Sequence, residues 1–181
     1  MTRAEGIVNI LKPPGMTSSD VVTDVRKLFE IRRVGHAGTL DPGAAGVLPV
    51  ALGRATRLFD ILVDKEKEYI AEIAFGACTD TQDSYGKVTR RSQTGVTREQ
   101  LCEALSGFVG GYTQTAPAYS ALKSGGKSLY ALARSGQEVP ARERAVDIRE
   151  LTLLCRTAQD RFLLRVRCSR GTYIRTLCED I

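Results

Sequence analysis

The sequence predicts an α+β fold in which helices flank a mixed, mostly antiparallel β-sheet. Apolar segments with the alternation of strands are interspersed with segments of helical periodicity, without the regular βαβ rhythm of a parallel sheet. The composition is globular, with 43% apolar and 26% charged residues among 181, and a chain of this length buries a core without disulfides or metal. No run approaches the roughly 18 apolar residues of a membrane span, and no apolar signal-peptide region follows Met1.

The first third of the chain contains two predicted strands and two predicted helices. In order, these are a strand at residues 6–11, a helix after the capping residues 17–20, a loop that begins at Ile31, a strand at Gly46–Leu52 and a helix at residues 54–62. The first helix is predicted because apolar side chains recur at helical spacing after side chains that cap helices. Its apolar stripe consists of Val21, Val22, Val25, Leu28 and Phe29.

The remaining elements follow from the same patterns. In order, they are a strand at 69–75, a polar loop at 76–86, a helix after Thr97, a glycine-rich segment at 107–126, a short basic helix at 127–134, paired strands at 148–155 and 162–168, and a helix from about Thr172. Thr97 and Gln100 have the spacing of a capping box. The apolar face after that box comprises Leu101, Ala104, Leu105 and Phe108.

The patterns of the last predicted strand and the last predicted helix indicate which of their side chains are buried. In the second of the paired strands, apolar side chains alternate with Arg165 and Arg167, so the arginines are expected on the opposite face. The final helix has one apolar stripe: Ile174, Leu177, Cys178 and Ile181. This helix reaches the last residue without a capping signal, so we expect that the chain is truncated at its C-terminal end.

The charge is lopsided. The formal net charge is +5. Residues 1–90 contain 12 basic and 12 acidic side chains, whereas residues 91–181 contain 14 and 9. Most of the basic residues are arginine, whose planar group suits phosphate and stacks on bases. The pattern favours a polyanion such as nucleic acid as partner, with a merely solvated basic face as the alternative.

Cysteine and histidine exclude several classes of site. The five cysteines form no CxxC pair and His36 is the sole histidine, so a structural zinc site is not expected. An odd cysteine count without a secretory signal is typical of reduced thiols in a cytoplasmic protein.

Asp41 is the candidate catalytic carboxylate. It precedes Pro42, which favours an extended backbone at Asp41, and nearby glycines allow a ligand to approach closely. A carboxylate held on such a loop is a candidate nucleophile or base, although Asp-Pro-Gly is also a common turn. Arg175 borders the apolar stripe of the last helix and needs an anionic partner, which could be an ordinary salt bridge. By default, Tyr69 is a core or rim aromatic and His36 a hydrogen-bonding loop residue.

A set of motifs in fixed order resembles the tRNA pseudouridine-55 synthase (TruB) family. The motifs are Lys12-Pro-x-Gly-Met-Thr-Ser, Arg33-x-Gly-His-x-Gly-Thr-Leu-Asp-Pro, Gly46-x-Leu-x-x-x-x-Gly, Lys67-x-Tyr, Thr79-Asp-Thr-x-Asp, Gln114-x-x-Pro-x-Tyr-Ser-Ala-x-Lys, Gly126-x-x-x-Tyr, Ala133-Arg-x-Gly and Ser169-x-Gly-Thr-Tyr-Ile-Arg. They extend over almost the whole chain. One departure is Ala116, where the family often has a second proline.

The resemblance implies the pseudouridine synthase fold and its domain organisation. Residues 1–181 would form the catalytic domain, with an RNA-binding insertion at about residues 119–144. The end of the catalytic domain and the small C-terminal RNA-binding domain of the family would be missing. The insertion contains basic side chains that would contact the RNA backbone: Lys123, Lys127, Arg134, Arg142 and Arg144.

The resemblance also implies an activity, the isomerisation of uridine 55 in the T-loop of tRNA to pseudouridine by base flipping. Asp41 would be the catalytic aspartate, acting either by attack on C1′ to form a glycosyl ester or by removal of the 2′ proton to give a glycal. Nothing is oxidised, reduced or added, so no cofactor and no metal are expected.

Further residues have implied substrate-binding roles. Arg175 resembles the arginine that pairs with the catalytic aspartate, and Tyr69 the tyrosine that stacks on the flipped uracil. His36 resembles the histidine that lies against the T-loop, and Lys12 with Pro13 the floor of the active site.

The expected partner is the T-arm stem–loop of tRNA, bound by a cytoplasmic monomer with no obligate protein partner and no membrane association. Two alternatives stay open. The chain could be a non-catalytic module that binds or folds tRNA, which the presence of Asp41 and Arg175 disfavours. It could also be a subunit of a guide-RNA-dependent synthase, for which the short N-terminal segment offers no support.

Overall fold

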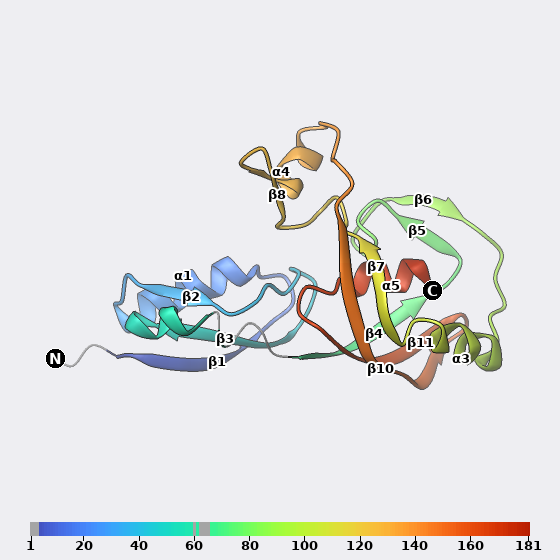
Figure 1. Ribbon diagram of the computed structural model, residues 1–181, viewed down its shortest axis with the longest axis horizontal. Coiled ribbons are helices and arrows are strands. Elements are labelled where there is room, and N and C mark those ends of the chain that lie inside the picture. The colour runs from blue at the N-terminus through green and yellow to red at the C-terminus, as the bar shows by residue number, and fades with distance from the viewer. Residues whose placement is uncertain (1–3, 60, 62–65) are drawn as a thin grey trace. The chain divides into compact units, whose positions relative to one another are not determined.

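The computed structural model describes residues 4–59, 61 and 66–181. It divides into two compact units, Met1–Lys65 and Glu66–Ile181, and each is described by itself. Every strand pairing among the described residues is antiparallel. Helices accompany these strands in both units (Figure 1). The predicted α+β class with antiparallel sheet is therefore confirmed.

The first unit is a three-stranded sheet with a helix packed on it. The strand order is β1 (Gly6–Lys12), β3 (Gly46–Leu52) and β2 (Val34–His36). At one end of the sheet Lys12 lies opposite Gly46. The helix α1 (Ser18–Phe29) completes an apolar core with the strands. The core residues are Val21, Val22, Val25, Ile31, Val34, Leu48, Val50 and Leu52.

The helix α1 forms for the predicted reasons and ends differently. Thr17 and Asp20 make the reciprocal hydrogen bonds of a capping box. The valines of the apolar stripe are buried, but Leu28 is 77% exposed and Phe29 is 37% exposed. The prediction that these last two residues face the core is wrong. The helix ends directly afterwards, with Glu30 in the left-handed conformation, so no further turn covers them.

Residues 31–62 differ in detail from the sequence-based expectation. The strand at Gly46–Leu52 is confirmed, but the short strand β2 within the expected loop was not predicted. The predicted helix at 54–62 is helical where it is described: η1 (Gly53–Leu58) is a 3-10 helix, and Phe59 and Ile61 are α-helical. The end of the helix predicted at 54–62 falls at positions 60 and 62, which lie outside the described residues. A three-residue strand has too few alternations to stand out in the sequence.

The second unit is built on a four-stranded sheet. Its order is β4 (Lys67–Ala74), β11 (Arg161–Cys168), β10 (Glu143–Ala158) and β7 (Gly110–Thr115). The predicted pair of strands is β10 and β11, and β10 is longer than expected and carries three register shifts. The strand β7 was not predicted, because two of its six residues are glycine and glycine weakens strand propensity.

Two helices cover the apolar side of this sheet. The helix α3 (Arg98–Ser106) begins at the predicted capping box of Thr97 and Gln100, and α5 (Ile174–Asp180) is the final helix. The buried core contains Ile73, Leu101, Leu105, Ile148, Phe162, Leu164, Val166, Cys168 and Leu177. The other residues of the predicted α5 stripe pack against that core. No helix within the described ranges is long and apolar enough to span a membrane.

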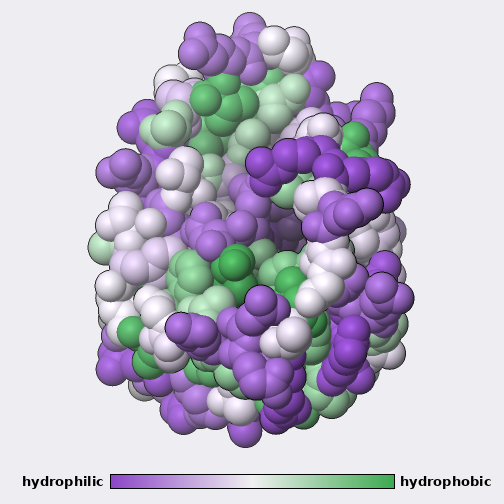
Figure 2. Space-filling model, turned by 90° about the vertical axis from the view of Figure 1, so that its right-hand side faces the viewer, coloured by the Kyte–Doolittle hydropathy of each residue, from purple (hydrophilic) through white to green (hydrophobic). Residues whose placement is uncertain are grey.

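The arginines of β11 form ion pairs with glutamates of β4 and with the glutamate just before it. Arg165 lies 3.0 Å from Glu68, Arg167 lies 2.9 Å from Glu66, and Arg161 is 3.1 Å from Glu72. All of these side chains are about half exposed, so each pair contributes little to stability. On the face drawn in Figure 2, hydrophilic residues surround an apolar patch. These three arginines of the basic second half are neutralised by partners in the chain.

Short elements complete the second unit. The strands β5 (Ala77–Thr79) and β6 (Val88–Arg91) form one hairpin, and β8 (Lys123–Ser124) and β9 (Lys127–Ser128) form another. The helix α4 (Leu129–Arg134) follows β9 and matches the predicted basic helix. Figure 1 shows β8 and α4 standing together beyond the ends of β7 and β10.

We expect Leu164→Ala to lower the free energy of unfolding by about 3 kcal/mol, because it leaves a cavity in a fully buried core. Leu154→Ala on β10, where the leucine is 43% exposed, is the control and should cost less than about 1 kcal/mol. Urea unfolding followed by circular dichroism measures both. Equal losses would contradict the assignment of this core.

Candidate functional site

Asp41 lies on the loop between β2 and β3, where the chain before it is tied to α1. The Leu40 amide donates to the Ser18 hydroxyl oxygen at 3.0 Å, and that hydroxyl lies 3.3 Å from the Leu40 carbonyl. Ser18 is buried, whereas Asp41 is half-buried. The Asp41 carbonyl accepts a hydrogen bond from the Ala44 amide at 3.0 Å, which closes a turn. The main chain of Leu40, directly before Asp41, is therefore bonded to the first residue of α1.

The chain after Asp41 is held as well. The Pro42 carbonyl accepts hydrogen bonds from the Gly15 amide at 2.8 Å and from the Lys12 ammonium at 3.3 Å. Lys12 is the last residue of β1, and Gly15 lies in the segment between β1 and α1. With both neighbours bonded, the Asp41 side chain leaves from a backbone whose direction is fixed, and a fixed carboxylate needs little reorganisation before it reacts.

Lys12 is the buried support of this loop. It is fully buried, and its ammonium donates to the carbonyls of Pro13, Met16 and Pro42 at 2.9, 2.8 and 3.3 Å. An ammonium has three protons, so three carbonyls satisfy it. Burial lowers the pKa of Lys12, and the charge of Asp41 partly opposes this shift. The structure thus brings Lys12 and Asp41 together.

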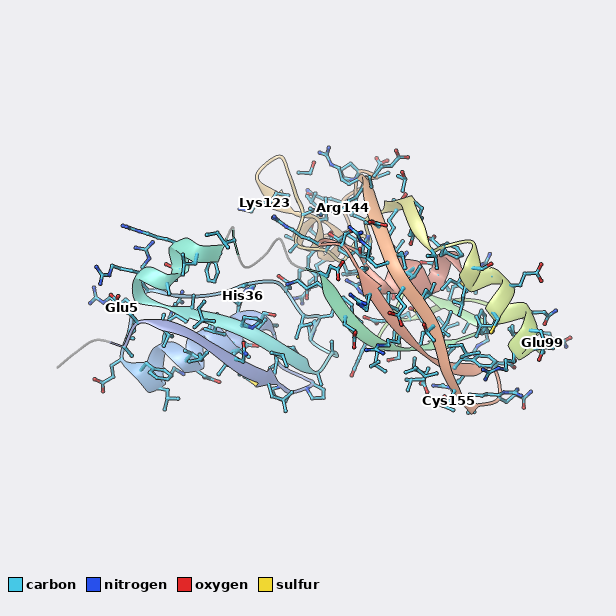
Figure 3. The ribbon with its side chains drawn as sticks, turned by 60° about the horizontal axis from the view of Figure 1, so that its bottom comes forward. Glu5, His36, Glu99, Lys123, Arg144 and Cys155 are labelled. Carbon is cyan, nitrogen blue, oxygen red and sulfur yellow. The ribbon has the colours of Figure 1, made fainter. Side chains whose placement is uncertain are left out.

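His36 is the last residue of β2 and is half-buried (Figure 3). Its Nδ1 bonds the carbonyl of Gly38. Because a carbonyl only accepts, Nδ1 carries the proton of the neutral ring. Gly38 has φ of 122°, a conformation that favours glycine. The bond orients the imidazole against the loop that carries Asp41.

Arg175 lies in the second unit, in the first turn of α5, and its guanidinium joins two loops. One terminal nitrogen donates to the Thr81 carbonyl at 2.9 Å, and the other donates to the Tyr119 carbonyl at 3.0 Å. Thr81 belongs to the loop between β5 and β6, and Tyr119 to the segment after β7. The arginine is half-buried. These bonds fix the guanidinium in one direction.

The loop that receives Arg175 is itself ordered by its polar side chains. Asp83 accepts hydrogen bonds from the Thr81 hydroxyl at 2.6 Å and from the Tyr85 amide at 2.9 Å. A side chain at Gly86 would place its Cβ 2.2 Å from the Thr81 hydroxyl oxygen and 2.5 Å from an Asp80 oxygen. The loop therefore needs glycine there, and the predicted polar loop at 76–86 has a defined shape.

Tyr69 lies on β4 opposite Val166 of β11. It is half-buried and packs against the core of the second unit. Asp41 belongs to the first unit and Tyr69 and Arg175 to the second, and the structure defines the surroundings of each within its own unit.

The five basic residues predicted to contact RNA occupy different environments. Lys123 and Lys127 are exposed on the hairpin of β8 and β9. Arg134 lies over the ring of Tyr130, 5.8 Å from its centre. Arg142 donates to Ser124 at 3.1 Å. Arg144 is on β10 (Figure 3), and its guanidinium occupies the space where Gly171 would carry a side chain.

Sequence reasoning missed the residues that support the loop of Asp41. Ser18 and Gly15 belong to the first motif of the resemblance, but Ser18 was counted only among the helix-capping residues 17–20 and Gly15 was assigned no role. Their function follows only from contacts with residues more than twenty positions away. Within the described residues, no group of three or more His, Cys, Asp or Glu side chains could hold a metal ion.

The chain matches one family model and several named proteins. Residues 26–174 match the family model described as TruB family pseudouridylate synthase, N-terminal domain. The chain belongs to the TruB family. The tRNA pseudouridine synthase B of Alkaliphilus oremlandii is 48% identical over 176 residues, which cover 97% of this chain and 58% of that protein. The tRNA pseudouridine synthase B of Caldanaerobacter subterraneus subsp. tengcongensis is 49% identical over 178 residues, with 98% and 62% covered.

Solved structures of the family share the fold. A chain in the crystal structure of a Cbf5-Nop10-Gar1 complex matches with a TM-score of 0.72 and 31% identity, over 96% of this chain and 42% of that one. A chain in the structure of an H/ACA RNP bound to a substrate RNA containing 2′-deoxyuridine matches with a TM-score of 0.66 and 29% identity, over 96% and 40%. This chain spans about three fifths of the length of the curated relatives it matches.

We expect Lys12→Met to lower the free energy of unfolding by about 2 to 3 kcal/mol, because buried carbonyls lose a charged donor. The matched control is Lys27→Met on α1, where the lysine side chain is 77% exposed; its effect should stay within about 0.5 kcal/mol. Thermal and urea unfolding measure the difference. A Lys12 variant as stable as the control would show that the ammonium does not hold the loop.

Proposed function

We propose that this chain is the catalytic part of an enzyme that isomerises uridine 55 in the T-loop of tRNA to pseudouridine, with Asp41 as the catalytic carboxylate. The observation that carries the proposal is the position of Asp41, on a loop tied on one side to Ser18 and on the other to Gly15 and Lys12. Membership of the TruB family and the names of the relatives support the reaction and the RNA.

The chemistry requires one well-placed carboxylate. The N1–C1′ bond of uridine breaks, the uracil turns, and C5 bonds to C1′ while the proton on C5 is lost and N1 gains one. Asp41 begins this exchange either by attack on C1′, with a glycosyl ester that later breaks, or by removal of the 2′ proton. Both routes need an ionised carboxylate with a fixed direction, and the bonded backbone on both sides of Asp41 supplies that direction.

Arg175 is proposed to be the arginine that pairs with the catalytic aspartate, as the resemblance implies. A guanidinium beside a carboxylate favours its ionised form in a pocket from which water is excluded. The bonds from Arg175 to the Thr81 and Tyr119 carbonyls support this role, because they leave the guanidinium little freedom. A preoriented charge costs less to use than one that must be ordered during the reaction.

Tyr69 and His36 are proposed to handle the flipped nucleotide. A buried uridine must leave its stack before a carboxylate can reach C1′, at a cost of a few kcal/mol. Tyr69 would stack on the uracil and assist removal of the proton from C5, and His36 would lie against the opened T-loop. The half-buried setting of both rings supports contact with a base rather than a purely internal role.

The insertion at 119–144 is proposed to contact the RNA backbone. Lys123, Lys127, Arg134 and Arg142 are exposed, as phosphate-binding side chains must be. Arg144 is half-buried against Gly171, so we assign it mainly to support of the loop before α5. The proposed enzyme acts as a cytoplasmic monomer on the T-arm stem–loop.

A guide-RNA-dependent synthase subunit is the second candidate, because the matched solved structures include the Cbf5-Nop10-Gar1 complex. Identity to that chain is 31%, whereas identity to the tRNA pseudouridine synthases B is 48–49%. The stand-alone tRNA activity is therefore preferred.

Asp41→Asn should abolish turnover and leave the affinity for a T-arm stem–loop within about threefold, because the amide keeps the size of the side chain and cannot act as an anionic nucleophile or base. Release of tritium from C5 of labelled uridine measures turnover, and filter binding measures affinity. Asp24→Asn on the exposed face of α1 is the control. Pseudouridine formation by the Asp41 variant at more than a few per cent of the parent rate would remove Asp41 from this role.

Tyr69→Phe and Tyr69→Ala should have different effects. The phenylalanine keeps the stacking surface and impairs only steps that use the hydroxyl, whereas alanine loses both, so its turnover should fall at least about tenfold further. Single-turnover rates with saturating enzyme separate the two variants. Equal and mild effects would return Tyr69 to a structural role in the core.

A further inference from the structure

Gln114 is a buried polar residue to which the proposed mechanism gives no part. It lies on β7 and is fully buried. Its Nε2 donates to the Tyr112 hydroxyl at 2.5 Å and to the Tyr173 carbonyl at 3.1 Å, while its Oε1 accepts from the Tyr173 amide at 2.9 Å. The side chain thus pairs with both main-chain groups of a residue 59 positions away.

Such an arrangement is costly unless complete. A buried amide group without hydrogen-bond partners lowers the free energy of unfolding by about 1 to 3 kcal/mol. In Gln114 both amide hydrogens and the oxygen make hydrogen bonds. An apolar side chain would fill the same volume with no such requirement. The presence of a glutamine here is therefore best explained by its two hydrogen bonds to the main chain of Tyr173.

The residue that Gln114 holds is the start of α5. Tyr173 is the N-cap of this helix, and its side chain makes no capping hydrogen bond. The helix has only seven residues, too few to be stable by themselves. Gln114 instead bonds the amide and the carbonyl of Tyr173 itself from the neighbouring sheet, and so fixes the main chain at the point where the helix begins, two residues before Arg175.

Other contacts confine the same segment. Thr176 is buried and its hydroxyl donates to the Gln82 side chain at 3.0 Å. The Arg144 guanidinium lies against Gly171, which has φ of 79°. Arg144 and Gln114 are direct partners in the pairing of β10 with β7. The start of α5 is thus confined on both sides of Arg175, by Gln114 at Tyr173 and by the bond of Thr176 to Gln82.

We propose that Gln114 is a positioning residue for Arg175. Its amide fixes the main chain at Tyr173, this sets the direction of the first turn of α5, and the guanidinium of Arg175 consequently reaches the Thr81 and Tyr119 carbonyls. The effect on turnover rests on the proposed function of Arg175, whereas the effect on the backbone does not.

The physical half of the proposal is tested by hydrogen exchange of the chain without RNA. Gln114→Met keeps the approximate volume and removes both bonds to Tyr173, so amides of peptides that cover residues 172–178 should exchange at least about tenfold faster. Tyr112→Phe is the control. It removes the third partner of Gln114 and the bond of Tyr112 to Asp180 at the far end of α5, but leaves both Tyr173 bonds, so exchange at residues 172–178 should stay within about twofold. Unchanged exchange in Gln114→Met overturns the proposal.

The functional half is tested by a double-mutant cycle with Arg175→Met. Turnover of Gln114→Met should fall about tenfold in the parent background and change less than about twofold in the Arg175→Met background, with RNA affinity within about threefold throughout. Leu101→Ala, a destabilising change in α3, controls for lost stability and should keep the parent turnover below its unfolding temperature. Should Gln114→Met not fold, Gln114→Asn, which keeps the amide and withdraws it by one methylene, is measured in the same way.

The outcomes separate the two proposals. Independent, multiplicative losses in the cycle would mean that Gln114 does not act through Arg175, while the role of Arg175 would stand. Full turnover of Arg175→Met would instead remove Arg175 from the proposed function, and with it the claim that Gln114 affects turnover through that residue.

Discussion

The ammonium of Lys12 is the contact on which the first unit depends. It is fully buried and serves three carbonyls that come from both ends of the segment between β1 and α1 and from the loop of Asp41. The apolar core alone does not place the loop of Asp41; the ammonium does so together with the bonds of Ser18 to Leu40 and of Gly15 to Pro42. The ammonium thus holds the loop that carries the Asp41 carboxylate. The cost is the desolvation of the lysine, which lowers its pKa.

In the second unit, the side chain of Arg175 is held by neutral groups. The amide of Gln114, the hydroxyl of Thr176 and the main chain of Thr81 and Tyr119 hold the start of α5 and its arginine. Neutral partners are less costly to bury than a charge, and each is satisfied only in one arrangement. In both units, then, the candidate site residues are half-exposed ends of polar networks whose other ends lie in or near the core.

The sequence predicted the elements that have strong local signals. The capping residues Thr17 and Thr97, the alternation in β11 and the stripe of α5 each arise from contacts between near neighbours, and the structure confirms them. The strands β2, β5 and β6 were missed because they have three or four residues. The strand β7 was missed because two of its six residues are glycine, and its pairing with β10 is a tertiary contact. Asp41, Tyr69 and Arg175 are proposed from motifs, whereas the partners that hold the loop of Asp41 and the guanidinium of Arg175 are set by tertiary contacts that no local pattern contains.

The ion pairs across β4 and β11 have a consequence for how the molecule meets a polyanion. Arg161, Arg165 and Arg167 are each matched by a glutamate about 3 Å away, so their fields cancel within less than the roughly 8 Å over which salt already screens exposed charges. A phosphate chain that diffuses toward this side experiences almost no pull. The exposed cations of the insertion, Lys123 and Lys127 among them, face no such cancellation in their hairpin. We therefore expect the long-range attraction of the proposed RNA substrate to act on the hairpin of the insertion more than on these strands.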